Sequence, residues 1–167
     1  EGAIAGRVVS GGGPDLGAAP GLDFVPASLM DEARAYRERT LARYSGGAGR
    51  GVATLTRIAR NSISAGDMEG AVRNFAIAVA ASPERSDLWA ELSRTAQAYT
   101  PQDAQLRRSL LSVSLSSALN AYQASRTTTD RADALAALAE ALVGVQNWRP
   151  ALSAYKASLA LRDVPAL

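Results

Sequence analysis

Cysteine and histidine are both absent from the 167-residue sequence. Without cysteine the chain has no disulfide, no thiolate zinc site and no cysteine nucleophile, and the count is silent on the redox compartment. Without histidine it also lacks the commonest general base and the commonest metal ligand. We therefore expect no catalytic residue, no metal site, no bound cofactor and no small-molecule substrate.

Acidic pairs are the remaining candidates for acid and base chemistry. They are Asp31 with Glu32, Asp67 with Glu69, and Asp87 with Glu91. Each pair stands at an expected helix start or on an exposed helix face, where a carboxylate serves as a cap or a surface charge. No nucleophile or oxyanion site accompanies them. An enzyme is therefore the least favoured class of function.

The sequence also lacks a strong excess of positive charge. Its 18 basic and 16 acidic residues leave a net charge of +2, well short of the dense positive face that binds nucleic acid. No apolar run approaches the roughly 20 residues that cross a bilayer. We expect neither a nucleic-acid partner nor direct membrane insertion. Because the chain begins at Glu1 without methionine or a signal peptide, we expect a soluble fragment or a processed chain.

The sequence does hold enough apolar material for one folded domain, with 47% apolar and 20% charged residues. The first 26 residues are the exception, because they contain seven glycines and three prolines. That composition disfavours a regular helix. We predict an extended linker or arm over residues 1–26, with a short strand through Ile4, Val8 and Val9 as the alternative.

A leading helix is predicted over residues 27–45. Ser28 stands where a hydroxyl can cap the first free amides. One stripe recurs at three- and four-residue spacing, namely Leu29, Ala33, Tyr36, Thr40 and Tyr44. Its arginines face water or, as the alternative, an acidic partner.

Three helix pairs follow, over residues 52–83, 86–125 and 131–162. Trp89 lies 34 residues after Leu55 on an equivalent helix face, and 34 is the tetratricopeptide period. Leu135 follows 46 residues later, so the middle pair holds the surplus. There Thr100 and Pro101 are expected to open a long second helix. The residues from Thr127 break that helix and cap the next one.

Small residues are predicted wherever two helices cross, and large residues fill the space around the crossings. The small set is Ala59, Ala71, Ser93, Ala139 and Ala151. The large set is Phe75, Trp89, Trp148 and Tyr155. The sequence therefore predicts an all-α fold, a tetratricopeptide-like right-handed helical array of about seven helices behind a glycine-rich arm.

The exposed face of each first helix in such an array is its usual binding groove. On this prediction the candidate groove contains Thr56, Arg60, Asp87, Arg94, Gln97 and Glu140. Only Arg60 and Arg94 suggest a clamp for a peptide carboxylate. The groove either captures a partner peptide or packs against the chain's own domains and solvent, and the second is favoured.

Two resemblances extend this interpretation. Residues 58–83 and 138–161 resemble tetratricopeptide repeats, whose W-x2-L-G-x2-Y, A-x3-F and P pattern is kept in part. A narrower resemblance rests on residues 5–9 (AGRVV), 15–17 (DLG), 24–26 (FVP), 31–37 (DEARAYR), 120–122 (NAY) and 148–161 (WRPALSAYKASLAL). These phrases are similar to the helical segment near the amino terminus of large bacterial alpha-2-macroglobulin-like proteins.

The resemblance implies a place between a PAN/apple-type domain and the macroglobulin domains of an envelope or periplasmic protease trap. In that family a cleaved bait segment triggers closure, and many members carry a cysteine thioester. A C-x-E-Q thioester requires the cysteine that these 167 residues lack. We therefore expect a non-catalytic interaction and spacer module of an endopeptidase inhibitor, whose partners are protein. The alternative is a free-standing tetratricopeptide adaptor or assembly subunit that binds a partner peptide in the groove.

Overall fold

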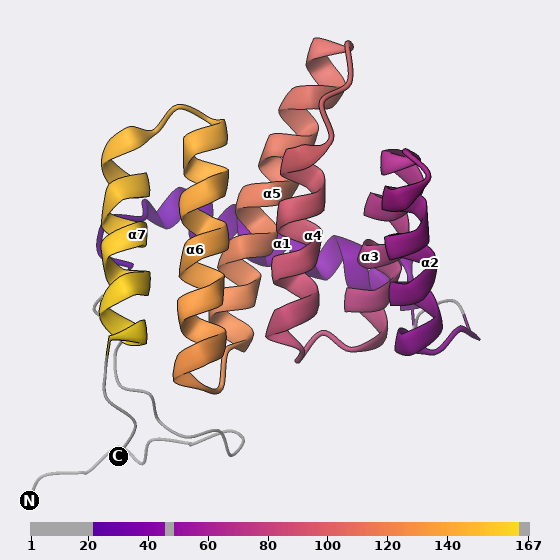
Figure 1. Cartoon of the computed structure of the whole chain (residues 1–167), viewed down its shortest axis with the longest axis horizontal. Coiled ribbons are helices and arrows are strands. Elements are labelled where there is room, and N and C mark those ends of the chain that lie inside the picture. Colours follow the sequence, from indigo (N-terminus) through magenta and orange to yellow (C-terminus); the bar gives the residue numbers. More distant parts are fainter. Residues whose placement is uncertain (1–21, 46–48, 164–167) are drawn as a thin grey trace, which may run out of the picture.

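The computed structural model describes residues 22–45 and 49–163, which form seven α-helices and no strand (Figure 1). The helices are α1 (Ala27–Arg43), α2 (Val52–Ser64), α3 (Met68–Ala81), α4 (Ser86–Ala98), α5 (Ala104–Ala124), α6 (Thr128–Gly144) and α7 (Trp148–Arg162). The predicted all-α class is therefore confirmed. The predicted arm over residues 1–26 lies outside the described residues except for 22–26, where the Val25 amide donates to the Leu22 carbonyl before α1.

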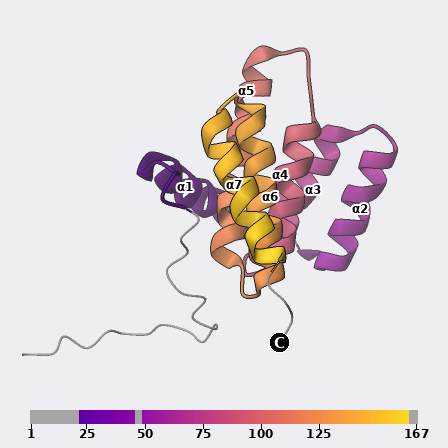
Figure 2. The same cartoon turned by 60° about the vertical axis from the view of Figure 1, so that its left-hand side comes forward.

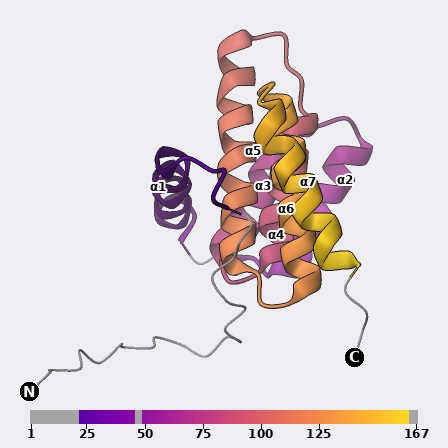
Figure 3. The ribbon, with the colours of Figure 1, turned by 90° about the vertical axis from the view of Figure 1, so that its left-hand side faces the viewer.

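Helices α2 to α7 stand side by side, and α1 runs across them (Figure 1). Contacts join α2 to α3, α4 to α5, and α6 to α7, and further contacts join α3 to α4, α5 to α6, and α4 to α6. Helix α1 contacts α5 and α3 instead of continuing the row. Figures 2 and 3 show it on one side of the other helices, next to α5. The leading helix thus closes one face of the row.

Three predicted helix ends differ from the structure. Helix α1 begins after Pro26 with no side-chain cap, so the Ser28 cap is wrong, and it ends at Arg43 instead of residue 45. Helix α5 begins at Ala104, because Asp103 rather than Thr100 accepts a hydrogen bond from the Leu106 amide, at 2.8 Å. Carboxylates are among the strongest caps. The predicted cap at Thr127 is confirmed by its 3.0 Å bond from the Asp130 amide.

The turn between α2 and α3 and the turn between α6 and α7 have the same hydrogen bonds. In the first, the amides of Ala65, Gly66 and Asp67 donate to the carbonyls of Asn61, Ile63 and Ser62. In the second, the amides of Val145, Gln146 and Asn147 donate to the carbonyls of Ala141, Val143 and Leu142. The central residues, Gly66 and Gln146, both have positive φ, 79° and 58°. The two hairpins therefore turn in the same way.

Changing Gly66 to alanine is expected to lower the free energy of unfolding by about 1 kcal/mol, because a Cβ is unfavourable at positive φ. Gly66→Asn is the matched control, since asparagine tolerates this region better. Urea denaturation followed by circular dichroism measures both. Equal stability of the alanine and asparagine variants would contradict the left-handed conformation at this turn.

Small residues bring the helices together, as predicted. Ala59, Ala71 and Ala139 are fully buried, and Ser93 and Ala151 are nearly so. At the crossing of α4 and α5 the Ser93 hydroxyl donates to the Ser114 carbonyl at 2.8 Å, and the Ser114 hydroxyl donates to the Ser93 carbonyl at 2.9 Å. The serines thus satisfy their own polar groups while allowing close approach.

The large residues divide into two groups. Phe75 and Trp89 are fully buried, as predicted, and the Trp89 ring meets the Tyr36 ring of α1 edge to face at 6.4 Å between centroids. Trp148 and Tyr155 were predicted as core, and that prediction is wrong because both are exposed on α7. The side of α7 that faces the core carries small residues instead, among them Ala151.

Candidate functional site

The predicted groove residues lie along α2, α4 and α6, and several of them contact one another. Arg60 of α2 pairs with Glu91 of α4 at 2.9 Å, and Arg94 of α4 pairs with Glu140 of α6 at 3.5 Å. The Gln97 side-chain amide donates to the Glu140 carbonyl at 2.6 Å. These contacts connect successive first helices, so this face is bridged by the chain's own side chains.

The other two predicted groove residues are occupied locally. The Thr56 hydroxyl is largely buried and donates to the Ala53 carbonyl at 3.1 Å. Arg85 donates two hydrogen bonds to Asp87, at 3.1 and 2.6 Å, which lowers the pKa of the Asp87 carboxyl.

A small hollow of about 210 Å³ on this face adds negative charge to the groove. Its acidic lining residues are Asp87, Glu91, Asp130 and Asp133, and Arg94 is its only cation. That charge does not favour a peptide carboxylate. Capture of a peptide in the groove stays a prediction.

A second surface was not predicted as a site. Trp148, Leu152, Tyr155 and Leu159 are 62%, 55%, 39% and 57% exposed. Their spacing of four, three and four residues places them on one face of α7, which we call the α7 stripe. Arg149 and Lys156, each one residue after a stripe member, are exposed beside it. Contiguous exposed apolar surface with a polar border is typical of interaction sites.

The sequence did contain a signal for the α7 stripe. Ala151, Ala154 and Ser158 share a second face of the same helix and are buried. Close packing on α6 admits the small face, and the Ser158 hydroxyl donates to the Ala132 carbonyl there at 2.7 Å. A helix with one small and one large apolar face therefore exposes the large one unless another element covers it.

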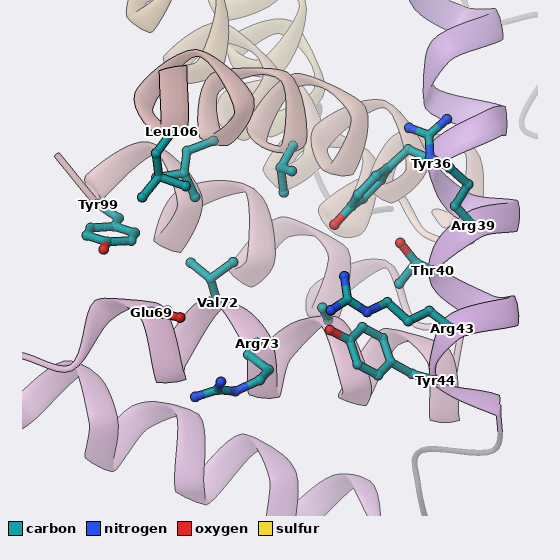
Figure 4. Close-up of a pocket in the computed structure, with 13 residues that line it drawn as sticks. Tyr36, Arg39, Thr40, Arg43, Tyr44, Glu69, Val72, Arg73, Tyr99 and Leu106 are labelled. Carbon is teal, nitrogen blue, oxygen red and sulfur yellow. The ribbon is translucent and has the colours of Figure 1, made fainter. Parts of the chain in front are cut away.

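A third feature is the α1 cleft, a hollow of about 560 Å³ where α1 crosses α3 and α5 (Figure 4). Its walls include Tyr36, Arg43 and Tyr44 from α1, Val72 and Arg73 from α3, and Leu110 from α5. Sequence reasoning missed this site, because no local pattern shows that α1 lies across the other helices. Burial raises the pKa of the Tyr36 hydroxyl in its wall, and hydrogen bonds with Thr40 and Ser117 partly oppose the shift.

Stability is expected to fall as the pH rises above about 10. Below the unfolded-state pKa of 10.0, Tyr36 is neutral in both states and its contribution is complete. Above it the unfolded chain loses the proton first, so unfolding becomes easier up to the raised pKa of the folded state. Tyr36→Phe should make this decline shallower in urea titrations between about pH 9 and 11. Tyr122 has a raised pKa for the same reason, so part of the decline should remain. An unchanged slope in the variant would contradict a buried, neutral Tyr36.

Two searches of the described residues and three comparisons complete the site description. None of the described helices is both long and apolar enough to cross a membrane. Within residues 22–45 and 49–163, no three acidic side chains gather as a potential metal site. No family model, curated protein or solved structure matches the chain, so its surfaces have to be interpreted from their own chemistry.

Proposed function

We propose that the chain is a non-catalytic spacer and protein-interaction module with a tetratricopeptide-like, right-handed arrangement of helix pairs. The observation that carries this proposal is the α7 stripe, an exposed apolar face on the last helix of the row. Helical arrays bury such a face against the next element, because each unit is stabilised by its neighbours. The module's work is then to hold a second protein surface against its end.

The proposed repeat arrangement is supported by two independent features. The hairpins α2–α3 and α6–α7 share the same turn hydrogen bonds, including a residue with positive φ at the same place. Leu55 and Trp89, which are 34 residues apart, are both fully buried on the first helices of successive pairs. Sequence period and local geometry thus agree with each other.

The charge around the α7 stripe indicates the kind of surface that covers it. Arg149 and Lys156 are exposed beside the stripe and have no acidic partner within the described residues. A second copy of α7 would bring like charges together, whereas a helix or sheet with acidic flanks would pair with them. We therefore propose a different protein surface, either a neighbouring domain of the same polypeptide or another subunit.

The same proposal places this module in a large bacterial alpha-2-macroglobulin-like protein of the periplasm or cell envelope. It rests on the sequence phrases, above all residues 148–161, which contain the α7 stripe. The intact mass of the natural protein tests it. A mass several times the 17.3 kDa of this chain is expected, and a natural protein near 17.3 kDa would contradict it.

The alternative is a free-standing adaptor that binds a peptide through Arg60 and Arg94, which lie on consecutive first helices. Both arginines already pair with carboxylates, so the peptide would have to displace Glu91 and Glu140. Binding to the natural partner separates the two functions. Loss of binding in the Arg60→Ala, Arg94→Ala double variant would favour the adaptor, and loss on changing the α7 stripe would favour the spacer.

A further inference from the structure

The α1 cleft has an apolar floor. Val72 and Ala76 of α3 form one part of it, and Leu110 and Val113 of α5 form another. Helix α1 is held over this floor by the Asn120 side chain, whose amide donates to the Ala33 carbonyl at 3.0 Å. The enclosed volume of about 560 Å³ is in the range of ordinary ligand sites, roughly 300–1,000 Å³.

Cations on opposite walls of the cleft are not neutralised by this chain. Arg43 of α1 and Arg73 of α3 have no carboxylate within 4 Å among the described residues. Arg43 lies over the Tyr44 ring, 5.2 Å from its centroid, which leaves the guanidinium free to donate hydrogen bonds. Arg39 also lines the cleft but pairs with Glu32. An anionic group between the two walls would meet two available guanidinium groups.

Further polar groups are spread along the cleft. Figure 4 shows the hydroxyls of Tyr36 and Tyr44 directed from α1 toward its interior. Tyr99 and Glu69 line the opposite end, and Glu69 is the only acid in the lining. Peptide amides can donate to Glu69, and hydroxyls can pair with peptide carbonyls. A fatty acid has a single polar end and would leave most of these groups unpaired.

We propose that the α1 cleft binds a short acidic peptide segment, with a carboxylate between Arg43 and Arg73 and an apolar side chain on the floor of α3 and α5. The bound segment crosses between α1 and α3, so it also fixes the leading helix on the row. None of the residues used belongs to the α7 stripe. This proposal and the spacer function can therefore fail independently.

Isothermal titration of the full 167-residue chain with unlabelled peptides tests the proposal. The probe is a five-residue peptide that alternates leucine and glutamate, and its control has glutamine in place of glutamate. We expect saturable binding of the acidic peptide, at least about tenfold tighter than binding of the glutamine peptide, because charge-assisted hydrogen bonds are lost in the control. Raising the salt concentration should weaken the acidic peptide alone.

Variants identify the site. Arg43→Gln with Arg73→Gln should raise the Kd for the acidic peptide about tenfold. The matched control is Arg57→Gln with Arg126→Gln, two exposed arginines outside the cleft, which should stay within about twofold. Circular dichroism confirms that each variant is folded. Equal binding of both peptides, an equal effect of both double variants, or binding of decanoate without binding of peptide would each overturn the proposal.

Discussion

Replacing Ser93 with leucine is expected to lower the free energy of unfolding by about 4 kcal/mol, through overpacking and through the loss of buried hydrogen bonds. Ser93 is 1% exposed where α4 crosses α5. A leucine there separates the helices and removes the hydroxyl that donates to the Ser114 carbonyl. Moving the backbone also weakens the return bond from Ser114.

The matched control is Ser112→Leu, the same substitution on the exposed side of α5. It is expected to change stability by less than about 0.5 kcal/mol. Urea denaturation of both variants, followed by circular dichroism, measures the difference. If Ser93→Leu were as stable as Ser112→Leu, the helices would not be in contact through their small residues.

The second large effect concerns binding. Changing Trp148, Leu152 and Leu159 together to glutamine should weaken binding to the surface that covers the α7 stripe by at least about 100-fold, since large apolar residues at an interface centre dominate affinity. Stability of the isolated chain should change by less than about 1 kcal/mol, because these side chains already contact water.

The partner for this measurement is found by photo-crosslinking from position 152 in the native cells, and affinity is then measured with the purified components. Ile63→Gln with Leu106→Gln is the control, since these residues are also apolar and about 40% exposed but lie on α2 and α5. An unchanged affinity in the stripe variant would show that α7 is not the interface.

Local patterns in the sequence are sufficient for the helices and for most of their contacts. Helical periodicity is local, so the spacing of apolar residues alone assigns Leu55 and Trp89 to buried faces. Small residues also mark crossings, because only they permit close approach, and Ser93 shows this. The predicted caps at Asp67 and Thr127 follow from the same kind of short-range rule.

What the sequence could not show depends on contacts between distant segments. Arg107 ends α4 by donating to the carbonyls of Gln97 at 2.8 Å and Tyr99 at 2.6 Å, a role that no spacing predicts. The Asn120 bond to α1 spans 87 residues. The α1 cleft follows from that crossing, so its residues had no common signal. Trp148 was misassigned because a large apolar residue suggests core unless the face it shares is considered.

The central claim is that the α7 stripe is covered in the native protein. Hydroxyl-radical footprinting, read residue by residue by mass spectrometry, compares the isolated 167-residue chain with the protein as it is purified from its cells. We predict that Trp148, 62% exposed in the isolated chain, is oxidised about fivefold more slowly in the native protein, whereas Ile63 of α2 reacts equally in both. Equal oxidation of Trp148 in the two samples would contradict the account.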